Sequence, residues 1–376
     1  MQYRNFGKLG IKGSAFGLGC MRFNGAASGD STIDEEKAVS LIRRAIDGGV
    51  TYLDTAYVYL GKTSEIVLGK ALKDGYRDRV TIATKMPAEA VHNRAEMEAL
   101  LEEELKKLQT DHIDFYLMHG INKEKWEYFK SIGAPEFFED MKKAGKIRFK
   151  CFSFHGPYEE FEYIIKDYDW DMCQIQYNFM DVENQAGTKG LELAGSLGIP
   201  VVIMEGLLGG RLAKAPDNVQ ALYDAFPVKR SPVEWAFRWL CNHPEIGTVL
   251  SGCNEPEQVD DNLRIFDTVE PGIMTPEELE LMDKVREAYI SRTKIGCTGC
   301  RYCMPCPNGV NIPGVFSAWN NHSLYNADLS TDWAFQGIIR NGETPENCVQ
   351  CGACEAACPQ HLPIIESLQK AWAELN

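Results

Sequence analysis

The sequence lacks long apolar runs. No stretch reaches the about 18 consecutive apolar residues that mark a membrane-spanning helix, and residues 1–10 contain Arg4 and Lys8 with no apolar block behind them. We therefore expect no signal peptide, no membrane partner and a cytoplasmic location. Positive charge is also scarce, because 39 Lys and Arg residues face 54 Asp and Glu residues, giving a net charge of −15. Nucleic acid is therefore a disfavoured partner, since it requires a cationic surface.

Cysteine is unevenly distributed along the chain. Eight of the 13 cysteines lie between Cys297 and Cys358. In a reducing compartment such a cluster of thiols indicates metal binding rather than disulfide bonds. We expect the five scattered cysteines to be small buried apolar residues. They are Cys20, Cys151, Cys173, Cys241 and Cys253.

Short apolar runs alternate with amphipathic helical windows from about residue 14 to residue 270. The strand candidates span residues 15–20, 51–55, 80–85, 113–119, 147–154, 172–177, 201–204 and 247–251. Helical windows such as 35–47 and 94–108 lie between them, with apolar residues on one stripe. Strands that alternate with helices indicate parallel βαβ units. Eight such units predict an α/β fold of the (β/α)₈ TIM-barrel type.

The pattern changes near residue 272. A helix signal opens at Thr275 and Pro276 and continues to about residue 292. The region from residue 296 onward is rich in Cys, Pro and Gly and then contains short helical windows. We therefore predict a barrel over residues 1–272, a connecting helix over 273–295 and a small C-terminal α-helical domain over 296–376.

Four polar residues end strand candidates or follow them directly: Asp54, Tyr59, Lys85 and His119. In a (β/α)₈ barrel the carboxyl ends of the strands form the active site. Any one of them alone is more commonly structural, but together they suit hydride transfer to a carbonyl group. We expect the Lys85 ammonium to lower the pKa of the Tyr59 phenol from its free value of about 10. Asp54 would hold Lys85, and His119 would offer a ring N–H to the substrate oxygen.

These residues stand in segments that resemble the aldo/keto reductase family. The segments are 54–59 (DTAYVY), 64–65 (SE), 84–85 (TK) and 117–119 (LMH), together with 3–10 (YRNFGKLG) and 16–19 (FGLG). The resemblance covers about residues 1–270. It implies NAD(P)H-dependent reduction of a small-molecule carbonyl, or oxidation of an alcohol. Tyr59 would be the proton donor, and Asp54, Lys85 and His119 would complete the catalytic tetrad.

The same resemblance implies where a dinucleotide binds. Ser153 and Gln174 would bond the nicotinamide carboxamide, with Asn178 in the same region. The segment 205–211 (EGLLGGR) resembles the loop that spans the phosphates, and 251–254 (SGCN) resembles the adenosine end. The implied contacts of these two regions are Glu205, Gly206, Leu207, Gly209, Gly210, Arg211, Ser251, Gly252, Asn254, Gln258 and Asn262. Gln258 stands where many relatives have an arginine for the 2′-phosphate, so the cofactor could be NADP or NAD.

The C-terminal cysteines form two arrays. The first is Cys297-x₂-Cys300-x₂-Cys303-x₂-Cys306-Pro, and the second is Cys348-x₂-Cys351-x₂-Cys354-x₃-Cys358-Pro. In two-cluster ferredoxins the fourth cysteine, next to a proline, ligates the partner cluster. We therefore assign Cys297, Cys300, Cys303 and Cys358 to one [4Fe–4S] cluster. Cys348, Cys351, Cys354 and Cys306 are assigned to the other. Zinc is the alternative, but zinc ribbons use only two cysteines per half.

The C-terminal module resembles the α-helical dicluster ferredoxin type, and the whole chain is similar to the iron–sulfur branch of the aldo/keto reductases. Nicotinamide transfers two electrons as hydride, whereas one cluster carries a single electron. Three hypotheses follow. In the hypothesis that we favour, the barrel performs hydride chemistry and the clusters are structural or pass electrons to a redox partner protein. Alternatively, the barrel holds FMN in a ferredoxin-coupled reductase, or it is a non-catalytic scaffold for an electron carrier or redox sensor.

Overall fold

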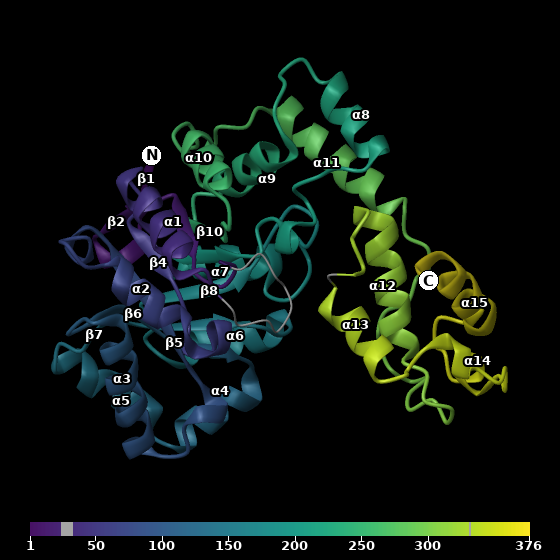
Figure 1. Ribbon diagram of the computed structural model, residues 1–376, viewed down its shortest axis with the longest axis horizontal. Coiled ribbons are helices and arrows are strands. Elements are labelled where there is room, and N and C mark those ends of the chain that lie inside the picture. The colour runs from purple at the N-terminus through teal and green to yellow at the C-terminus, as the bar shows by residue number, and fades with distance from the viewer. Residues whose placement is uncertain (24–32, 331) are drawn as a thin grey trace. The chain divides into compact units, whose positions relative to one another are not determined.

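A computed structural model describes residues 1–23, 33–330 and 332–376. These residues form two compact units (Figure 1). The first contains residues 1–209 and 233–276, and the second contains residues 210–232 and 277–376. The segment 210–232 and the helix predicted as a connector therefore group with the C-terminal part. Within the described ranges, no helix has both the length and the hydropathy to cross a lipid bilayer.

The first unit is a closed barrel of eight parallel strands, which confirms the predicted (β/α)₈ fold. Around the ring the order is β10-β3-β4-β5-β6-β7-β8-β9. The strands are β3 (Phe16–Gly19), β4 (Tyr52–Asp54), β5 (Thr81–Pro87), β6 (Ile113–Ile121), β7 (Ile147–Phe154), β8 (Met172–Gln176), β9 (Val201–Met204) and β10 (Ile246–Ser251). Each overlaps one of the eight candidates from the sequence.

Helices surround the barrel and cover its outer face (Figure 1). They are α1 (Glu35–Asp47), α2 (Ser64–Ala71), α3 (Arg94–Leu108), α4 (Lys123–Ser131), α5 (Ala134–Lys143), α6 (Tyr158–Asp167), α7 (Gly187–Ser196), α9 (Pro232–Cys241) and α10 (Pro256–Ile265). The two helices predicted at 35–47 and 94–108 begin at capping side chains. Asp34 accepts a hydrogen bond from Lys37 N, and Asn93 accepts one from Glu96 N. Such caps satisfy backbone donors that the first helical turn leaves unpaired.

The barrel interior is filled by apolar side chains at one end and by polar side chains at the other. Phe6 lies in an N-terminal hairpin, between β1 (Tyr3–Asn5) and β2 (Lys12–Ser14), and its ring packs on Tyr52 and Phe115. Successive side chains of a strand point to opposite faces. Asp54 therefore shares the inward face with Tyr52 two residues earlier. The same alternation places Lys85 and His119 on the inward face, next to the apolar side chains that fill the other end of the barrel.

The second unit is α-helical. Its helices are α8 (Asp217–Ala225), α11 (Pro276–Ile290), α12 (Ile312–Tyr325), α13 (Trp333–Arg340), α14 (Ala353–Ala356) and α15 (Ile364–Leu375). A small core forms where α12, α13 and α15 meet, and it includes Phe316, Trp319, Phe335 and Leu368. Six of the eight array cysteines pack against this core. They are Cys297, Cys303, Cys306, Cys348, Cys354 and Cys358.

Candidate active site and cysteine cavities

The four tetrad candidates come from three neighbouring strands and one loop. Asp54 ends β4, Lys85 lies in β5 and His119 lies in β6. Tyr59 follows β4 in a tight turn in which Leu60 and Lys62 have left-handed backbone conformations, with φ of 51° and 71°. The turn brings the Tyr59 side chain back over the strand ends. The structure therefore brings together the polar residues that the sequence singled out.

Lys85 is the centre of the polar cluster. Its side chain is 1% exposed, and its Nζ lies 2.5 Å from Asp54 Oδ1 and 2.7 Å from the Thr55 carbonyl oxygen. The same nitrogen lies 3.4 Å from the Tyr59 hydroxyl. Burial alone would lower the pKa of Lys85, but the Asp54 carboxylate and the Tyr59 hydroxyl hold it above its usual value. Lys85 is therefore a charged ammonium within reach of the phenol.

The pKa of Tyr59 differs from the expectation drawn from the sequence. Burial raises the pKa, the Lys85 ammonium lowers it in part, and the net direction is upward. The physical reason is that burial destabilises the charged phenolate more than the Lys85 ammonium, 3.4 Å away, stabilises it. Tyr59 is therefore a protonated phenol at neutral pH, with the Lys85 ammonium 3.4 Å from its hydroxyl.

His119 lies beside Tyr59 at the barrel mouth. The two rings meet edge to face, with their centroids 5.8 Å apart. Burial lowers the pKa of His119 to about 3, and the positive charges of Lys85 and Lys125 add to this effect. The imidazole is therefore neutral at working pH and can donate one ring N–H.

Gln174 reaches the tetrad from the opposite side of the ring. Its Nε2 donates to Asp54 Oδ2 at 3.2 Å, across the barrel from β8 to β4. Its Oε1 is buried and accepts no hydrogen bond from the described part of the chain. Ser153 Oγ accepts from Gly120 N at 2.7 Å, which leaves the hydroxyl proton available. Asn178 instead ties two loops together, because its Nδ2 donates to the Glu205 carbonyl oxygen.

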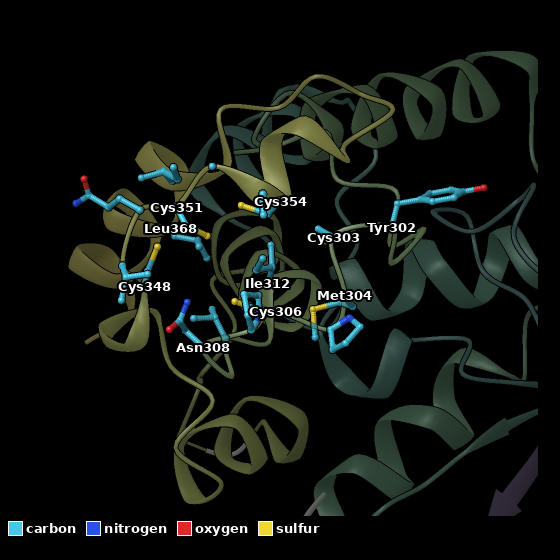
Figure 2. A pocket seen from close by; sticks show the side chains of 18 residues that line it. Tyr302, Cys303, Met304, Cys306, Asn308, Ile312, Cys348, Cys351, Cys354 and Leu368 are labelled. Carbon is cyan, nitrogen blue, oxygen red and sulfur yellow. The ribbon is translucent and has the colours of Figure 1, made fainter.

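The eight array cysteines line two cavities of the second unit. The first cavity has Cys297, Cys300, Cys303 and Cys358 in its wall. The second is wider, at about 180 Å³, and has Cys303, Cys306, Cys348, Cys351 and Cys354 in its wall (Figure 2). Within the described ranges no three His, Cys, Asp or Glu side chains converge tightly enough for a single metal ion. The thiols are instead spread around the cavity walls.

Residues 15–287 match the model of the aldo/keto reductase family. The chain belongs to the aldo/keto reductase family. Residues 296–362 match the model of the 4Fe-4S dicluster domain, so the barrel is joined to an iron–sulfur domain, as the resemblance implied. The five scattered cysteines are all buried, as expected.

Relatives in the family align with parts of the chain. The chain is 39% identical over 156 residues to aldo-keto reductase YhdN of Bacillus subtilis, covering 39% of this chain and 45% of the relative. It is 31% identical over 164 residues to probable aldo-keto reductase 1 of Glycine max, covering 40% and 45%. The chain thus spans less than half the length of these curated relatives. The holo form of aldo-keto reductase AKR11C1 from Bacillus halodurans superposes with a TM-score of 0.64 at 26% identity, covering 76% of this chain and 96% of that one.

The structure places the remaining residues of the implied family cofactor site at two loops. After β9, Glu205 is exposed with a left-handed backbone, and Gly206 packs closely on Leu240 and Val249. Leu207 packs against the barrel core, and Gly209 has a left-handed backbone. Gly210 and Arg211 belong to the second unit, where Arg211 forms an ion pair with Asp332 at 3.0 Å.

The loop after β10 is held together by its own side chains. Asn262 Nδ2 donates to Ser251 Oγ at 3.1 Å, and Gln258 Oε1 accepts from Asn254 N at 2.9 Å. Gln258 therefore serves as part of a capping box at the start of α10. Gly252 packs against the aliphatic stem of a neighbouring arginine.

That arginine, Arg22, is the residue that the sequence reasoning missed. A Cβ added at Gly252 would stand 3.1 Å from Arg22 Cγ, and one at Gly209 would stand 3.7 Å from a terminal guanidinium nitrogen. Arg22 therefore lies between the two loops that the resemblance assigns to a dinucleotide. Its position two residues after the first strand candidate was the available signal.

Proposed function

We propose that the barrel reduces a small-molecule carbonyl, or oxidises the corresponding alcohol, with NADP(H) or NAD(H). The observation that supports this most is the buried Asp54–Lys85–Tyr59 contact at the carboxyl ends of the strands. A phenol that is protonated at rest and stands beside an ammonium is a proton donor whose conjugate base is stabilised in place.

The chain's own residues then have separate tasks. Tyr59 gives its hydroxyl proton to the substrate oxygen, and Lys85 stabilises the phenolate left behind. Neutral His119 orients that oxygen with a ring N–H. Asp54 keeps Lys85 charged and fixed, because its carboxylate is buried with the ammonium.

The barrel mouth also fits a nicotinamide dinucleotide, which supplies the hydride when bound. The unpaired Gln174 Oε1 suits the carboxamide N–H, and the Ser153 hydroxyl suits the carboxamide oxygen. Arg22 places a guanidinium beside Gly209 and Gly252, one glycine from each loop. A guanidinium is well suited to bind phosphate oxygens. We include Arg22 with the residues that the resemblance implied.

Replacement of Tyr59 by Phe tests the assignment. The variant should lose NAD(P)H-dependent carbonyl reduction by roughly 10²-fold or more, because the positioned proton donor is gone while the ring remains. Dinucleotide binding, measured by nucleotide fluorescence, and iron content should stay at wild-type levels. Carbonyl reduction by Tyr59→Phe at the wild-type rate would contradict the proposed mechanism.

For the second unit we propose two [4Fe–4S] clusters, one in each cavity. Each cavity wall contains the four cysteines assigned to that cluster from the array spacing, and Cys303 borders both cavities. The clusters are structural or pass electrons to a redox partner protein. Anaerobic purification with iron, sulfide and flavin measured together should give about eight irons and about eight sulfides per chain, without flavin. Release of FMN on denaturation would favour the ferredoxin-coupled alternative.

A further inference from the structure

One edge of the second cavity lies open to solvent. Val349 stands between Cys348 and Cys351 in the chain, lines this cavity and is 64% exposed. Cys351 is exposed as well. Figure 2 shows Cys348 and Cys351 on the side of the cavity away from Tyr302, whose ring points outward from it. A cluster ligated here would thus lie directly beneath a surface that carries a bare aliphatic side chain.

The chain around this edge is acidic. Between residues 341 and 369 there are four glutamates and no lysine or arginine, with Arg340 and Lys370 on either side and Lys370 paired with Glu366. The four glutamates are Glu343, Glu346, Glu355 and Glu366. The loop of residues 296–311, which contributes to the walls of both cavities, has Arg301 and no acidic residue. Glu346 is exposed and lies three residues before Val349. The acidic side chains near the second cavity therefore come from the segment 341–369 and not from the loop 296–311.

We propose that the acidic edge, formed by Glu346, Val349 and Cys351, is the docking surface for a one-electron carrier protein with a basic face around its redox centre. The proposal rests on the proposed cluster function and identifies the surface at which the electron carrier would bind. A reduced cluster held in the second cavity would give one electron to the oxidised carrier, with no bond made or broken. Electron carriers form small, transient interfaces, in which complementary charge sets the association rate. An exposed apolar side chain surrounded by charged residues is typical of such an interface.

The test follows electron transfer from the loaded protein without any turnover in the barrel. The holoprotein is reduced anaerobically with dithionite, freed of excess reductant and mixed in a stopped-flow instrument with ferric cytochrome c, a basic one-electron acceptor. Binding of redox-inactive zinc cytochrome c is measured separately by calorimetry. Glu346→Lys should lower the second-order rate constant at low salt by roughly threefold to tenfold and flatten its dependence on ionic strength. Val349→Ser should weaken zinc cytochrome c binding several-fold, by about 1 kcal/mol.

Two matched variants separate a local surface from a general effect. Glu280→Lys makes the same change in net charge at an exposed site on α11. Val228→Ser removes the same side chain where it is 44% exposed, outside both cavity walls. Both should behave as wild type. Equal slowing in Glu346→Lys and Glu280→Lys would overturn the proposal, and so would faster transfer to an acidic flavodoxin than to cytochrome c.

The two levels of inference fail differently. A protein that binds no iron would refute the cluster function and the docking surface together. The docking surface alone would be refuted if the protein holds both clusters but neither substitution has an effect. In that case Glu346→Lys would leave the electron-transfer rate constant unchanged, and Val349→Ser would leave zinc cytochrome c binding unchanged.

Discussion

Replacement of Asp54 by Asn isolates the electrostatic core of the site. Asp54 is 3% exposed and Lys85 is 1% exposed, so neither side chain can recruit solvent if the other is lost. Asn keeps the shape of the side chain and can still meet Gln174, but it removes the negative charge. The Lys85 ammonium would then have only neutral partners, namely the Asn side-chain oxygen, the Thr55 carbonyl and the Tyr59 hydroxyl.

The expected cost follows from that burial. Removing one member of a buried ion pair typically destabilises a protein by about 3–5 kcal/mol, because an uncompensated charge remains. Lys85 reduces the cost by losing its proton, and each unit by which its folded pKa drops below about 10.4 corresponds to about 1.4 kcal/mol. The unfolded chain then binds more protons than the folded chain between these two pKa values, so the stability of Asp54→Asn rises with pH in that window.

A double-mutant cycle provides the measurement. Urea unfolding under anaerobic conditions, followed by circular dichroism for the barrel and by visible absorbance for the cluster domain, gives the free energy of unfolding of each variant. Lys85→Met, which keeps the length of the side chain, should also be destabilised. The double variant Asp54→Asn/Lys85→Met should recover most of the loss, because no buried charge remains.

Two results would refute this reasoning. A loss below about 1 kcal/mol in Asp54→Asn at about pH 7 would show that the pair is solvated, as surface pairs are. Additive losses in the double variant would show that the two residues act separately.

Three further predictions concern other buried groups and the clusters. Burial raises the pKa of Glu104 well above its usual range and the Glu65 charge raises it further, so Glu104 contributes stability that is lost as pH rises above its unfolded value of about 4.3. In urea unfolding, Glu104→Gln should therefore gain stability relative to wild type between about pH 5 and about pH 8, and a constant difference would contradict this. The pKa of about 3 for His119 predicts that the pH profile of kcat/KM has no inflection from this residue near pH 6.5, and that the Asn variant leaves the shape of the profile unchanged. Cys358→Ser should lose about half of the bound iron and keep the electron paramagnetic resonance signal of the cluster in the second cavity, whereas loss of both signals would contradict the assignment.

The sequence predicted most of the barrel because its strands and helices have different apolar periods. The candidates 51–55, 80–85 and 113–119 end at or next to Asp54, Lys85 and His119, so these three positions could be proposed without coordinates. The pKa of Tyr59 could not be predicted in the same way, because it depends on how much water the fold excludes. Arg22 was missed since its loop partners are distant in the sequence. The grouping of residues 210–232 with the C-terminal unit depends on contacts such as Arg211 with Asp332, which no local pattern reveals.

The hydrogen bond from Gln174 to Asp54 spans the barrel at the carboxyl ends of its strands. Strands on opposite sides of the ring are tied together at this level, so the position of Asp54 is set by the strands, whereas Tyr59 is positioned by the turn after β4. Under the proposed function, loops other than the turn that carries Tyr59 can be exchanged to accept other substrates while the proton donor keeps its position. A redesign of substrate acceptance under that function should therefore leave position 174 and the turn after β4 unchanged and alter residues farther out.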